Sequence, residues 1–476
     1  MHSKDASNPS SRGDLPSYLS VCIDYWAGSL PFSVLRSNHL SSSRFQSQTY
    51  LCGRHEHTMK RIWISYCAFL LAGGIGAYGQ IPSSFFGMGV SVSSDAPKVP
   101  YGTLSHPGVA WTTIEGAARG SYNFRATDSF VKIAPKDANG VALIDIVMGW
   151  TPSWAVADQS TCFHNNKAGQ LVCTAPPDNL QDWIDFITAL VNHYNGVTAP
   201  HVKYYEIWNE MSNTKFWTGT PAQMVALAQA AYPIIKQDPY AVVVTPSVVW
   251  SNGVGYMTKY LQAGGNLYAD ALSFHGYPSQ TGFGFTTPVP MPESPLSTNA
   301  PIMTMITTFR GIADSNGMLG KPIMTTEGGW GTNGVADPDM QAAWITHYEI
   351  LQAALATTNN LQFQTWYTWG YVQSGTIENK DGTATAAGLD YSVVLTWLTG
   401  FSPTPCTVSG NIYTCKVAFE KEIVWDTSQT CSNGVCTTAP YAVDPAYTKS
   451  EEITGLKVPI YKNSVNLGIK PLLLVK

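Results

Sequence analysis

The stretch HVKYYEIWNE, residues 201 to 210, ends a run of strand-favouring residues on an Asn-Glu pair. Its β-branched and aromatic side chains predict a buried strand. Glu210 then stands where that strand reaches solvent, a place where a lone Asn-Glu pair is more often a helix cap or a surface pair than a catalytic group. What Glu210 does depends on how many such strands the chain has and in what order they come.

Eight segments between residues 83 and 400 have the composition of strands, and amphipathic helical segments separate them. The expected strands are residues 85–92, 108–115, 141–150, 202–210, 241–247, 271–278, 322–329 and 361–370. Helices are best marked at 180–194, at 302–312 and after Thr220-Pro221, a capping residue followed by a proline. The alternation predicts the α/β class and a (β/α)8 TIM barrel. An open doubly wound sheet is less favoured, because it usually carries a nucleotide-binding loop, which the chain after residue 79 lacks.

The chain before residue 80 differs in composition from the barrel. Residues 1–58 are rich in serine and other polar residues, so we expect them to be disordered or an artefact of an upstream start codon, with Met59 as the true start. Residues 59–79 show a Lys60-Arg61 pair, an apolar stretch too short to span a bilayer, and small residues, the layout of a secretory signal peptide. We therefore expect a secreted or periplasmic protein with no membrane span in its mature chain.

A formal dinucleotide pattern, Gly74-x-Gly76-x-x-Gly79, follows no expected strand and predicts no cofactor site. Residues 80–400 are expected to form the barrel. After residue 400 the sequence changes to short strand-like runs and turns, which predicts a β-rich, sandwich-like accessory domain at 401–476. The segment just after residue 80 could lend a strand to this domain.

The cysteine pattern agrees with export. Of nine cysteines, three precede residue 80: Cys22, Cys52 and Cys67. The short spacings among the others suggest three disulfides, although other connectivities are possible: Cys162–Cys173, Cys406–Cys415 and Cys431–Cys436. A zinc site that includes His164 is the alternative for the first pair, but no CxxC motif supports it.

Composition favours carbohydrate over nucleic acid or membrane as a partner. Charged residues make up 12% of the chain and the formal net charge is −5, so no basic surface is predicted. Aromatic residues also make up 12%, with 15 Trp and 24 Tyr, whose faces can stack on sugar rings. The part after residue 79 contains neither GxSxG nor HExxH, which argues against an esterase or a zinc peptidase. No metal or organic cofactor is implied.

Two carboxylates end expected barrel strands. Glu210 ends the fourth strand, and Glu327, in TTEGGW, ends the seventh. The C-terminal ends of barrel strands meet at one mouth, where functional groups gather. Paired carboxylates carry out glycoside hydrolysis, in which one protonates the leaving oxygen and the other attacks the anomeric carbon. Glu206 shares strand parity with Glu210 but lies deeper, so we expect a structural partner inside the barrel.

Around these positions the motifs EIWNE, SFHGYP and TEGGW resemble glycoside hydrolase clan A, the superfamily of retaining (β/α)8 glycosidases. The run at 216–247 and the GWTPSWA motif after the third strand look most like families 39 and 5 of that clan. The resemblance covers residues 83 to about 400. It departs at Met211, where a proline commonly follows Asn-Glu, and at the second strand, which shows no arginine at its end.

The resemblance implies a role for each matching residue. Glu210 would be the acid/base and Glu327 the nucleophile, which requires an ionised Glu327 beside a protonated Glu210. Asn209 would bind the substrate hydroxyl next to the reacting carbon. His275 and Tyr277 would flank the nucleophile, and Trp366 would form the floor of the sugar subsite. Other tryptophans at strand ends are further expected substrate contacts: Trp150, Trp154 and Trp330.

We therefore expect a secreted O-glycosyl hydrolase that cleaves β-glycosidic bonds in an oligo- or polysaccharide through a covalent glycosyl-enzyme. The alternative is a non-catalytic carbohydrate-binding protein on the same barrel, which would keep the aromatic residues but need not keep both glutamates. Transglycosylation uses the same two residues, so the sequence leaves it open, together with the sugar and the linkage.

Overall fold

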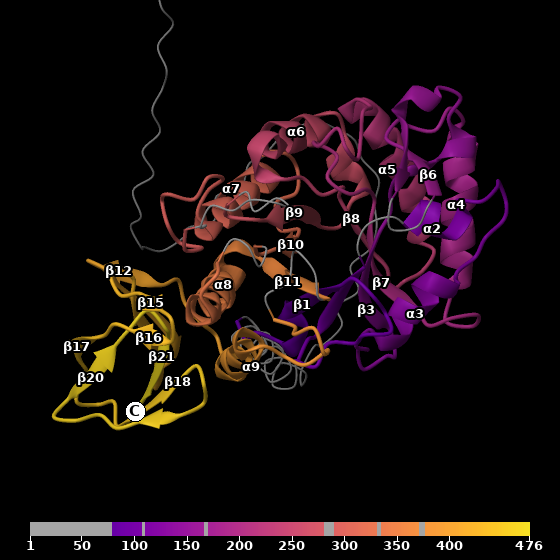
Figure 1. Cartoon of the computed structure of the whole chain (residues 1–476). Helices are drawn as coiled ribbons and strands as arrows, with labels where there is room; N and C mark the ends of the chain where they lie inside the picture. The colour runs from indigo at the N-terminus through magenta and orange to yellow at the C-terminus, as the bar shows by residue number, and fades with distance from the viewer. Residues whose placement is uncertain (1–78, 107–109, 166–169, 280–289, 331–334, 371–376) are drawn as a thin grey trace, which may run out of the picture. The chain divides into compact units, whose positions relative to one another are not determined.

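The structure is a computed structural model, and it describes residues 79–106, 110–165, 170–279, 290–330, 335–370 and 377–476 (Figure 1). The expected leading extension, 1–58, lies outside the described residues, and so does the expected signal peptide, 59–79, except for Gly79. Among the helices that the structure describes, none is both long and apolar enough to cross a membrane.

Eight parallel strands form a barrel. They are β1 Phe86–Val90, β2 Thr103–His106, β3 Ala142–Val147, β7 Val202–Glu206, β8 Val242–Val244, β9 Leu272–Gly276, β10 Ile323–Gly328 and β11 Leu361–Trp369. Their order in the sheet is β8-β7-β3-β2-β1-β11-β10-β9. A parallel bridge between Val244 and Ala271 joins the two outermost strands and closes the sheet. The predicted (β/α)8 barrel is thereby confirmed.

Helices surround the barrel and follow its strands in the chain (Figure 1). They are α2 Ala110–Glu115, α3 Arg125–Ile133, α4 Leu180–His193, α5 Pro221–Ile235, α6 Trp250–Gln262, α7 Ile302–Ser315, α8 Pro338–Asn359 and α9 Ala386–Leu398. α5 begins as predicted, because the Thr220 hydroxyl accepts the backbone N–H of Gln223 and Pro221 occupies the first helical turn. The main hydrophobic core lies between these helices and the outer face of the sheet.

One expected strand is wrong. Residues 108–115 include the helix α2, and the second barrel strand is the shorter Thr103–His106. The β-branched and aromatic residues of this segment favour a strand in isolation, but packing decides otherwise. In the helix, Trp111 is fully buried against Trp183 and Phe186, and its indole N–H donates to Glu115 one turn on, at 2.9 Å.

The barrel interior is filled in layers. The lowest is apolar and contains Tyr204, Val244, Ala271, Met324 and Phe363. Above it lies a polar layer, in which Glu206 accepts a hydrogen bond from the Ser273 hydroxyl at 2.8 Å, and Ser273 is bonded to Thr326 at 2.7 Å. The side chain of Glu206 is fully buried there, the interior position that strand parity predicts.

The region after α9 is β-rich, as predicted. Its largest sheet is antiparallel and has the order β12-β13-β14-β21-β18-β19, formed by Thr407–Ser409, Ile412–Ala418, Lys421–Asp426, Leu472–Val475, Lys449–Glu452 and Lys457–Val458. Two small antiparallel sheets of two strands each accompany it, β15 Cys431–Ser432 with β16 Val435–Cys436, and β17 Ala439–Ala442 with β20 Ser464–Leu467. A small apolar cluster joins β20 to the large sheet and makes the region sandwich-like.

The segment just after residue 80 does not join these sheets. Ile81 bridges to Thr399 and donates its backbone N–H to the carbonyl of Phe401 at 2.7 Å. It therefore pairs with the chain that leaves α9, not with a strand of the accessory region.

All three expected disulfides are present: Cys162–Cys173, Cys406–Cys415 and Cys431–Cys436. The first excludes the zinc alternative at these cysteines, because both sulfurs are bonded to each other. It also links two strands of a small sheet of the order β4-β6-β5, formed by Thr151–Pro152, Gln170–Cys173 and Cys162–Asn165.

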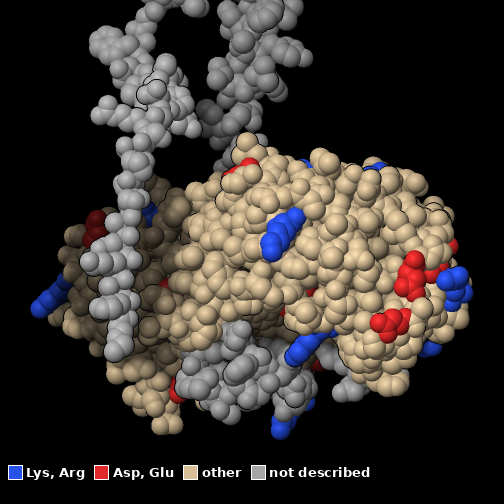
Figure 2. All heavy atoms as spheres, turned by 90° about the horizontal axis from the view of Figure 1, so that it is seen from above, with Lys and Arg blue, Asp and Glu red and all other residues tan. Residues whose placement is uncertain are grey.

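Charged side chains are sparse on the molecular surface. Figure 2 shows one face of the molecule, on which Lys, Arg, Asp and Glu are few and scattered. This agrees with the charged fraction of 12% and offers no continuous basic patch on that face for a polyanion.

Candidate active site

Glu210 lies just beyond the end of β7, in a backbone conformation that its surroundings maintain. Its φ of 41° falls in the left-handed region, which costs a non-glycine residue roughly 1 kcal/mol or more. Ser247, beyond β8, accepts the Glu210 N–H on its hydroxyl at 3.0 Å and the Met211 N–H on its carbonyl at 2.9 Å. A proline at position 211 has no N–H and could not donate this second bond. This explains why a residue other than proline follows Asn-Glu here.

Glu327 reaches the same mouth because β10 contains a bulge. Thr325 pairs with Phe274 while Glu327 pairs with the next residue of β9, His275, so Thr326 is the extra residue. In a regular strand, neighbouring side chains point to opposite faces. Here Thr326 bonds inward to Ser273, and Glu327 also points inward, because the bulge changes the alternation.

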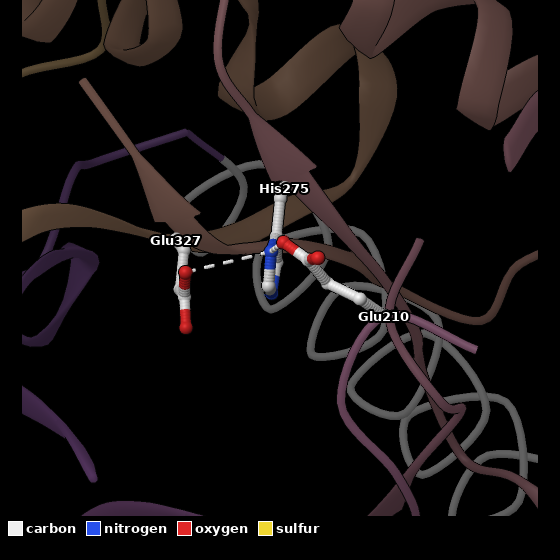
Figure 3. Close-up of side chains that lie close together, drawn as sticks. All are labelled: Glu210, His275 and Glu327. Atoms are coloured by element: carbon white, nitrogen blue, oxygen red, sulfur yellow. Dashed lines mark hydrogen bonds and ion pairs between the residues drawn. The ribbon is translucent and has the colours of Figure 1, made fainter. Parts of the chain in front are cut away.

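His275 stands between the two glutamates (Figure 3). Its Nδ1 lies 2.9 Å from Glu210 Oε1 and 3.5 Å from Glu327 Oε2. The amide of Asn213 donates to Glu210 Oε2 at 2.8 Å, and the Tyr277 hydroxyl donates to Glu327 Oε2 at 3.0 Å. The predicted residues 210, 275, 277 and 327 are thus brought together, and Asn213 is a member that the sequence motifs did not single out.

The two carboxylates are close and still accessible. One oxygen of each, together with a ring nitrogen of His275, forms a group of atoms that all lie within 4.8 Å of one another. The side chains of Glu210 and Glu327 are each 12% exposed, whereas His275 is 1% exposed. A small molecule at the barrel mouth can therefore touch both carboxylates while the histidine supports them from below.

Burial and neighbouring charges shift the pKa values of all three groups. Burial raises the pKa of Glu327 to about 7, the charge of His275 partly offsets this, and the negative Glu210 adds to it. Burial also acts to raise the pKa of Glu210, but hydrogen bonds from His275 and Asn213 outweigh it and leave the pKa lowered. For His275, burial is outweighed by the charges of Glu327 and Glu210, which raise its pKa to about 9.

The resting charge order is therefore the reverse of the expected one. The acid/base role needs a protonated Glu210 and an ionised Glu327, whereas the unliganded site favours an ionised Glu210 beside a charged His275. The two arrangements of the Glu210–His275 pair hold the same number of protons. They differ only by transfer of one proton across a contact of 2.9 Å.

Two buried polar atoms at the site have no hydrogen-bond partner among the described residues: Asn209 Oδ1 and His275 Nε2. Asn209 is 6% exposed and directly precedes Glu210. A buried polar atom without a partner is costly, so a ligand hydroxyl that bonds it is favoured. This suits the expected role of Asn209 toward the substrate.

The structure does not place Trp366 as a sugar platform. Its ring is fully buried and packs edge-to-face on Trp330 at 4.8 Å and on Tyr348 of α8 at 5.7 Å, outside the barrel wall. Trp330 is itself only 3% exposed. No sugar can stack on a ring whose surface is already covered, so these two expected contacts lack an open face.

Tyr367 is the neighbouring residue whose hydroxyl feels the carboxylates. Burial raises the pKa of this hydroxyl, and the charges of Glu327 and Glu210 add to the increase. Phe363, four residues earlier on β11, points into the barrel against Tyr204, with ring centroids 5.0 Å apart. Counting alternate residues from Phe363 leads to Tyr367 and not to Trp366, so strand parity could have identified this residue.

The other two expected tryptophans differ in their surroundings. Trp150 is half-buried, stacks on Phe216 with ring centroids 5.3 Å apart, and donates its indole N–H to the carbonyl of Lys215 at 3.0 Å. Trp154 instead packs edge-to-face on Trp111 and donates to the carbonyl of Glu115 at 2.8 Å, so its polar atom is engaged by α2.

A metal site is the alternative use of this cluster. In the described part of the chain, the group of His, Cys, Asp and Glu side chains close enough together to hold a metal ion is Glu210, His275 and Glu327. Two carboxylates and an imidazole suit several divalent metals. The arrangement is equally what a metal-free pair of acid/base and nucleophile requires. Removal of metal separates these two possibilities.

Comparison with known proteins places the fold. No known family model matches the chain, and no curated protein sequence matches it. Among solved structures, it is similar to a family 39 glycoside hydrolase from the gut symbiont Bacteroides cellulosilyticus WH2, at 18% identity and a TM-score of 0.59, over 83% of this chain and 81% of that one. It is also similar to a monomeric beta-xylosidase from Caulobacter crescentus CB15, at 14% identity and a TM-score of 0.55, over 83% and 96% of the two chains.

A third similar structure is the GH39 enzyme from Xanthomonas axonopodis pv. citri, at 14% identity and a TM-score of 0.55, over 84% of this chain and 95% of that one. By its fold, the chain is a (β/α)8 barrel of the kind found in these glycoside hydrolase structures. This confirms the resemblance to clan A at the level of the fold.

Proposed function

We propose that the protein is a retaining glycoside hydrolase of the clan A type, which cleaves β-glycosidic bonds by double displacement. The proposal is carried by one observation: carboxylate oxygens from the ends of β7 and β10 lie within 4.8 Å of each other at the barrel mouth. Retaining enzymes hold their carboxyl groups about 5 to 5.5 Å apart, whereas inverting enzymes leave roughly 6.5 to 9.5 Å for a water molecule.

The first step forms a covalent intermediate. A Glu327 oxygen attacks the anomeric carbon, the bond from that carbon to the leaving oxygen breaks, and the leaving oxygen takes the proton of Glu210. In the second step, Glu210 accepts a proton from water while the water oxygen attacks the anomeric carbon. The bond to Glu327 then breaks, which restores both carboxyl groups.

The neighbours of the two glutamates have supporting roles in this scheme. Asn209 binds the hydroxyl next to the reacting carbon with its free oxygen. Tyr277 holds the Glu327 oxygen that does not attack, through its bond of 3.0 Å. Transfer of the His275 proton to Glu210, across their contact of 2.9 Å, converts the resting charge order into the reactive one.

We further propose that the protein works outside the cytoplasm. Its three disulfides support this, because such bonds persist mainly in oxidising compartments. The expected leader at residues 59–79 would provide the export signal. A β-linked oligo- or polysaccharide is the proposed substrate, and β-xylosides come first in a test panel because one similar structure is a beta-xylosidase.

The test is hydrolysis of aryl β-glycosides and β-glycans by residues 80–476, beside Glu210→Ala and Glu327→Ala, with azide present. We expect the unaltered protein to cleave at least one substrate with retention. Azide should rescue Glu327→Ala with an α-glycosyl azide product and Glu210→Ala with a β-glycosyl azide product.

Glu420→Ala is the matched control, because Glu420 is exposed in the turn between β13 and β14. It should retain full activity. A protein that binds glycans but cleaves none of a broad panel would contradict the proposal and favour the non-catalytic carbohydrate-binding alternative.

A further inference from the structure

Three aromatic rings lie together beside the turn that carries Glu210. Trp150 follows β3, Phe216 ends the turn, and Phe163 lies on β5. The Trp150 ring stacks on Phe216, with centroids 5.3 Å apart and planes at 9°, and meets Phe163 edge-to-face, also at 5.3 Å. We call these three rings the aromatic ledge.

The ledge is joined to Glu210 by a short chain of hydrogen bonds. The backbone N–H of Asn213 donates to the carbonyl of Glu210 at 2.8 Å, and the N–H of Phe216 donates to the carbonyl of Asn213 at 2.9 Å. The indole N–H of Trp150 donates to the carbonyl of Lys215 at 3.0 Å. Glu210 and Phe216 are therefore parts of one hydrogen-bonded turn, to which Trp150 is also bonded, and the side-chain amide of Asn213 connects this turn to the Glu210 carboxylate.

A covalent bond supports the outer ring. Phe163 follows Cys162, whose disulfide to Cys173 links β5 to β6. β6 in turn pairs with β4, which begins at Thr151, directly after Trp150. The disulfide and these strand pairings thus hold Phe163 against Trp150.

The rings are too exposed for core packing to explain them. Phe163 is 39% exposed, and Trp150 and Phe216 are half-buried, whereas the tryptophans behind the barrel wall are covered almost completely. A cluster of exposed aromatic rings at the C-terminal end of a barrel is typical of a ligand site. Flat rings of this kind bind the apolar faces of sugars and aryl groups.

The proposed chemistry decides which part of a substrate would reach the ledge. Glu210 must touch the leaving oxygen that it protonates, so the leaving group lies on the side of Glu210. The cleaved sugar lies over Glu327. Since Phe216 belongs to the turn of Glu210 and Trp150 is bonded to that turn, the ledge lies on the side of Glu210, and so on the side of the leaving group.

We propose that Trp150, Phe163 and Phe216 form a leaving-group subsite that binds a sugar ring or an aryl group by stacking. This inference rests on the proposed function. It predicts that the enzyme prefers substrates with a ring on the leaving side, and that a sugar acceptor binds there during transglycosylation.

The experiment compares two substrates that share the sugar cleaved in the panel: its β-linked disaccharide and its glycosyl fluoride. Fluoride is too small to reach the ledge. We expect Phe163→Ala to lower kcat/KM for the disaccharide about tenfold, and to change kcat/KM for the fluoride by less than about twofold. Phe419→Ala is the control, because Phe419 is 91% exposed on the accessory region and should alter neither rate.

An equal loss on both substrates, or no loss on the disaccharide, would overturn the ledge while leaving the hydrolase proposal intact. Phe216→Leu repeats the test from the other side of Trp150, and thermal melting checks that each variant is folded. Binding of xylo- and cello-oligosaccharides by calorimetry is a readout without catalysis. If no glycoside is cleaved, the hydrolase proposal fails. Binding then tests whether the ledge binds sugar rings: Phe163→Ala should weaken it about tenfold, and unchanged binding would contradict the ledge.

Discussion

Glu210 and Glu327 face each other with the same exposed fraction, 12% of each side chain, yet their surroundings drive their pKa values apart. Glu210 is bonded to both Asn213 and His275. Among the described residues, Glu327 accepts a hydrogen bond from Tyr277 alone, and it lies in the field of a second carboxylate. Equal exposure therefore does not give equal charge. The number of hydrogen-bond donors and the distance to the charged His275, 2.9 Å from Glu210 and 3.5 Å from Glu327, distinguish the two carboxylates.

The largest expected effect separates the two glutamates by leaving group. Glu327→Gln should lower kcat/KM by about 10⁴-fold or more on every substrate, because the covalent step needs this carboxylate. Glu210→Gln should cost roughly 10²- to 10⁴-fold on a disaccharide, but about tenfold or less on a 2,4-dinitrophenyl glycoside, whose leaving group needs no proton. Losses that are equal on both substrates for Glu210→Gln would contradict the assigned roles.

The pH profile tests the charge order directly. Below about 7, Glu327 is protonated and cannot attack, so kcat/KM should fall as the pH drops through that value. Above about 9, the His275–Glu210 pair loses its proton and nothing protonates the leaving group, so kcat/KM should fall again. We expect a bell-shaped profile with these two limbs. A profile with both limbs below pH 6 would refute the resting charge order.

Replacing His275 should change both limbs of the pH profile. In His275→Gln the positive charge that lowers the pKa of Glu327 is gone, so the acid limb should move above 7, and the limb near 9 should be lost. We expect kcat/KM at pH 8 to fall about 10- to 100-fold. His201→Gln, which breaks another histidine–carboxylate pair of 2.8 Å with Asp238, is the control and should leave the profile in place.

Smaller effects are expected from the flanking donors. Tyr277→Phe removes the hydroxyl that donates to Glu327, so we expect a loss of about tenfold in kcat/KM and an upward shift of the acid limb. Asn213→Ala removes one of two donors to Glu210, and a loss of about threefold should follow. Tyr461→Phe, at an exposed ring, controls for the loss of a hydroxyl. A Tyr277→Phe enzyme with an unshifted acid limb would count against the bond to Glu327.

Removal of metal ions is expected to have no effect on activity. Dialysis against EDTA should leave kcat/KM unchanged, because two carboxyl groups and a proton source suffice for the proposed reaction. Activity that is lost with EDTA and restored by one divalent metal would show instead that the carboxylates and His275 work as metal ligands.

Much of the fold could be predicted because it depends on local patterns. Runs of β-branched residues between amphipathic helices identified the barrel strands, apart from 108–115, where packing of Trp111 against α4 outweighs strand propensity. Short spacings predicted the disulfides. Motifs at strand ends brought Glu210, Glu327 and His275 to one place, since parallel strands end at the same mouth.

The rest required contacts between distant segments. The bulge at Thr326 cannot be inferred from alternation alone. The resemblance implied Trp366 as the floor of the sugar subsite, whereas strand parity counted from Phe363 leads to Tyr367. The aromatic ledge joins residues from β5, from the end of β3 and from the turn after β7. No local spacing places these three rings together.

The sequence by itself predicted the barrel, favoured the three disulfide pairs and identified the strand ends that carry the two glutamates, because each follows from patterns along the chain. Tertiary structure alone decided which of them holds the proton at rest. A pKa depends on the donors and charges that folding brings within a few ångströms of a carboxylate, here Asn213, His275 and Tyr277. Those neighbours come from two segments far apart in the chain, the turn after β7 and the end of β9, so the charge state of the site exists only in the folded chain.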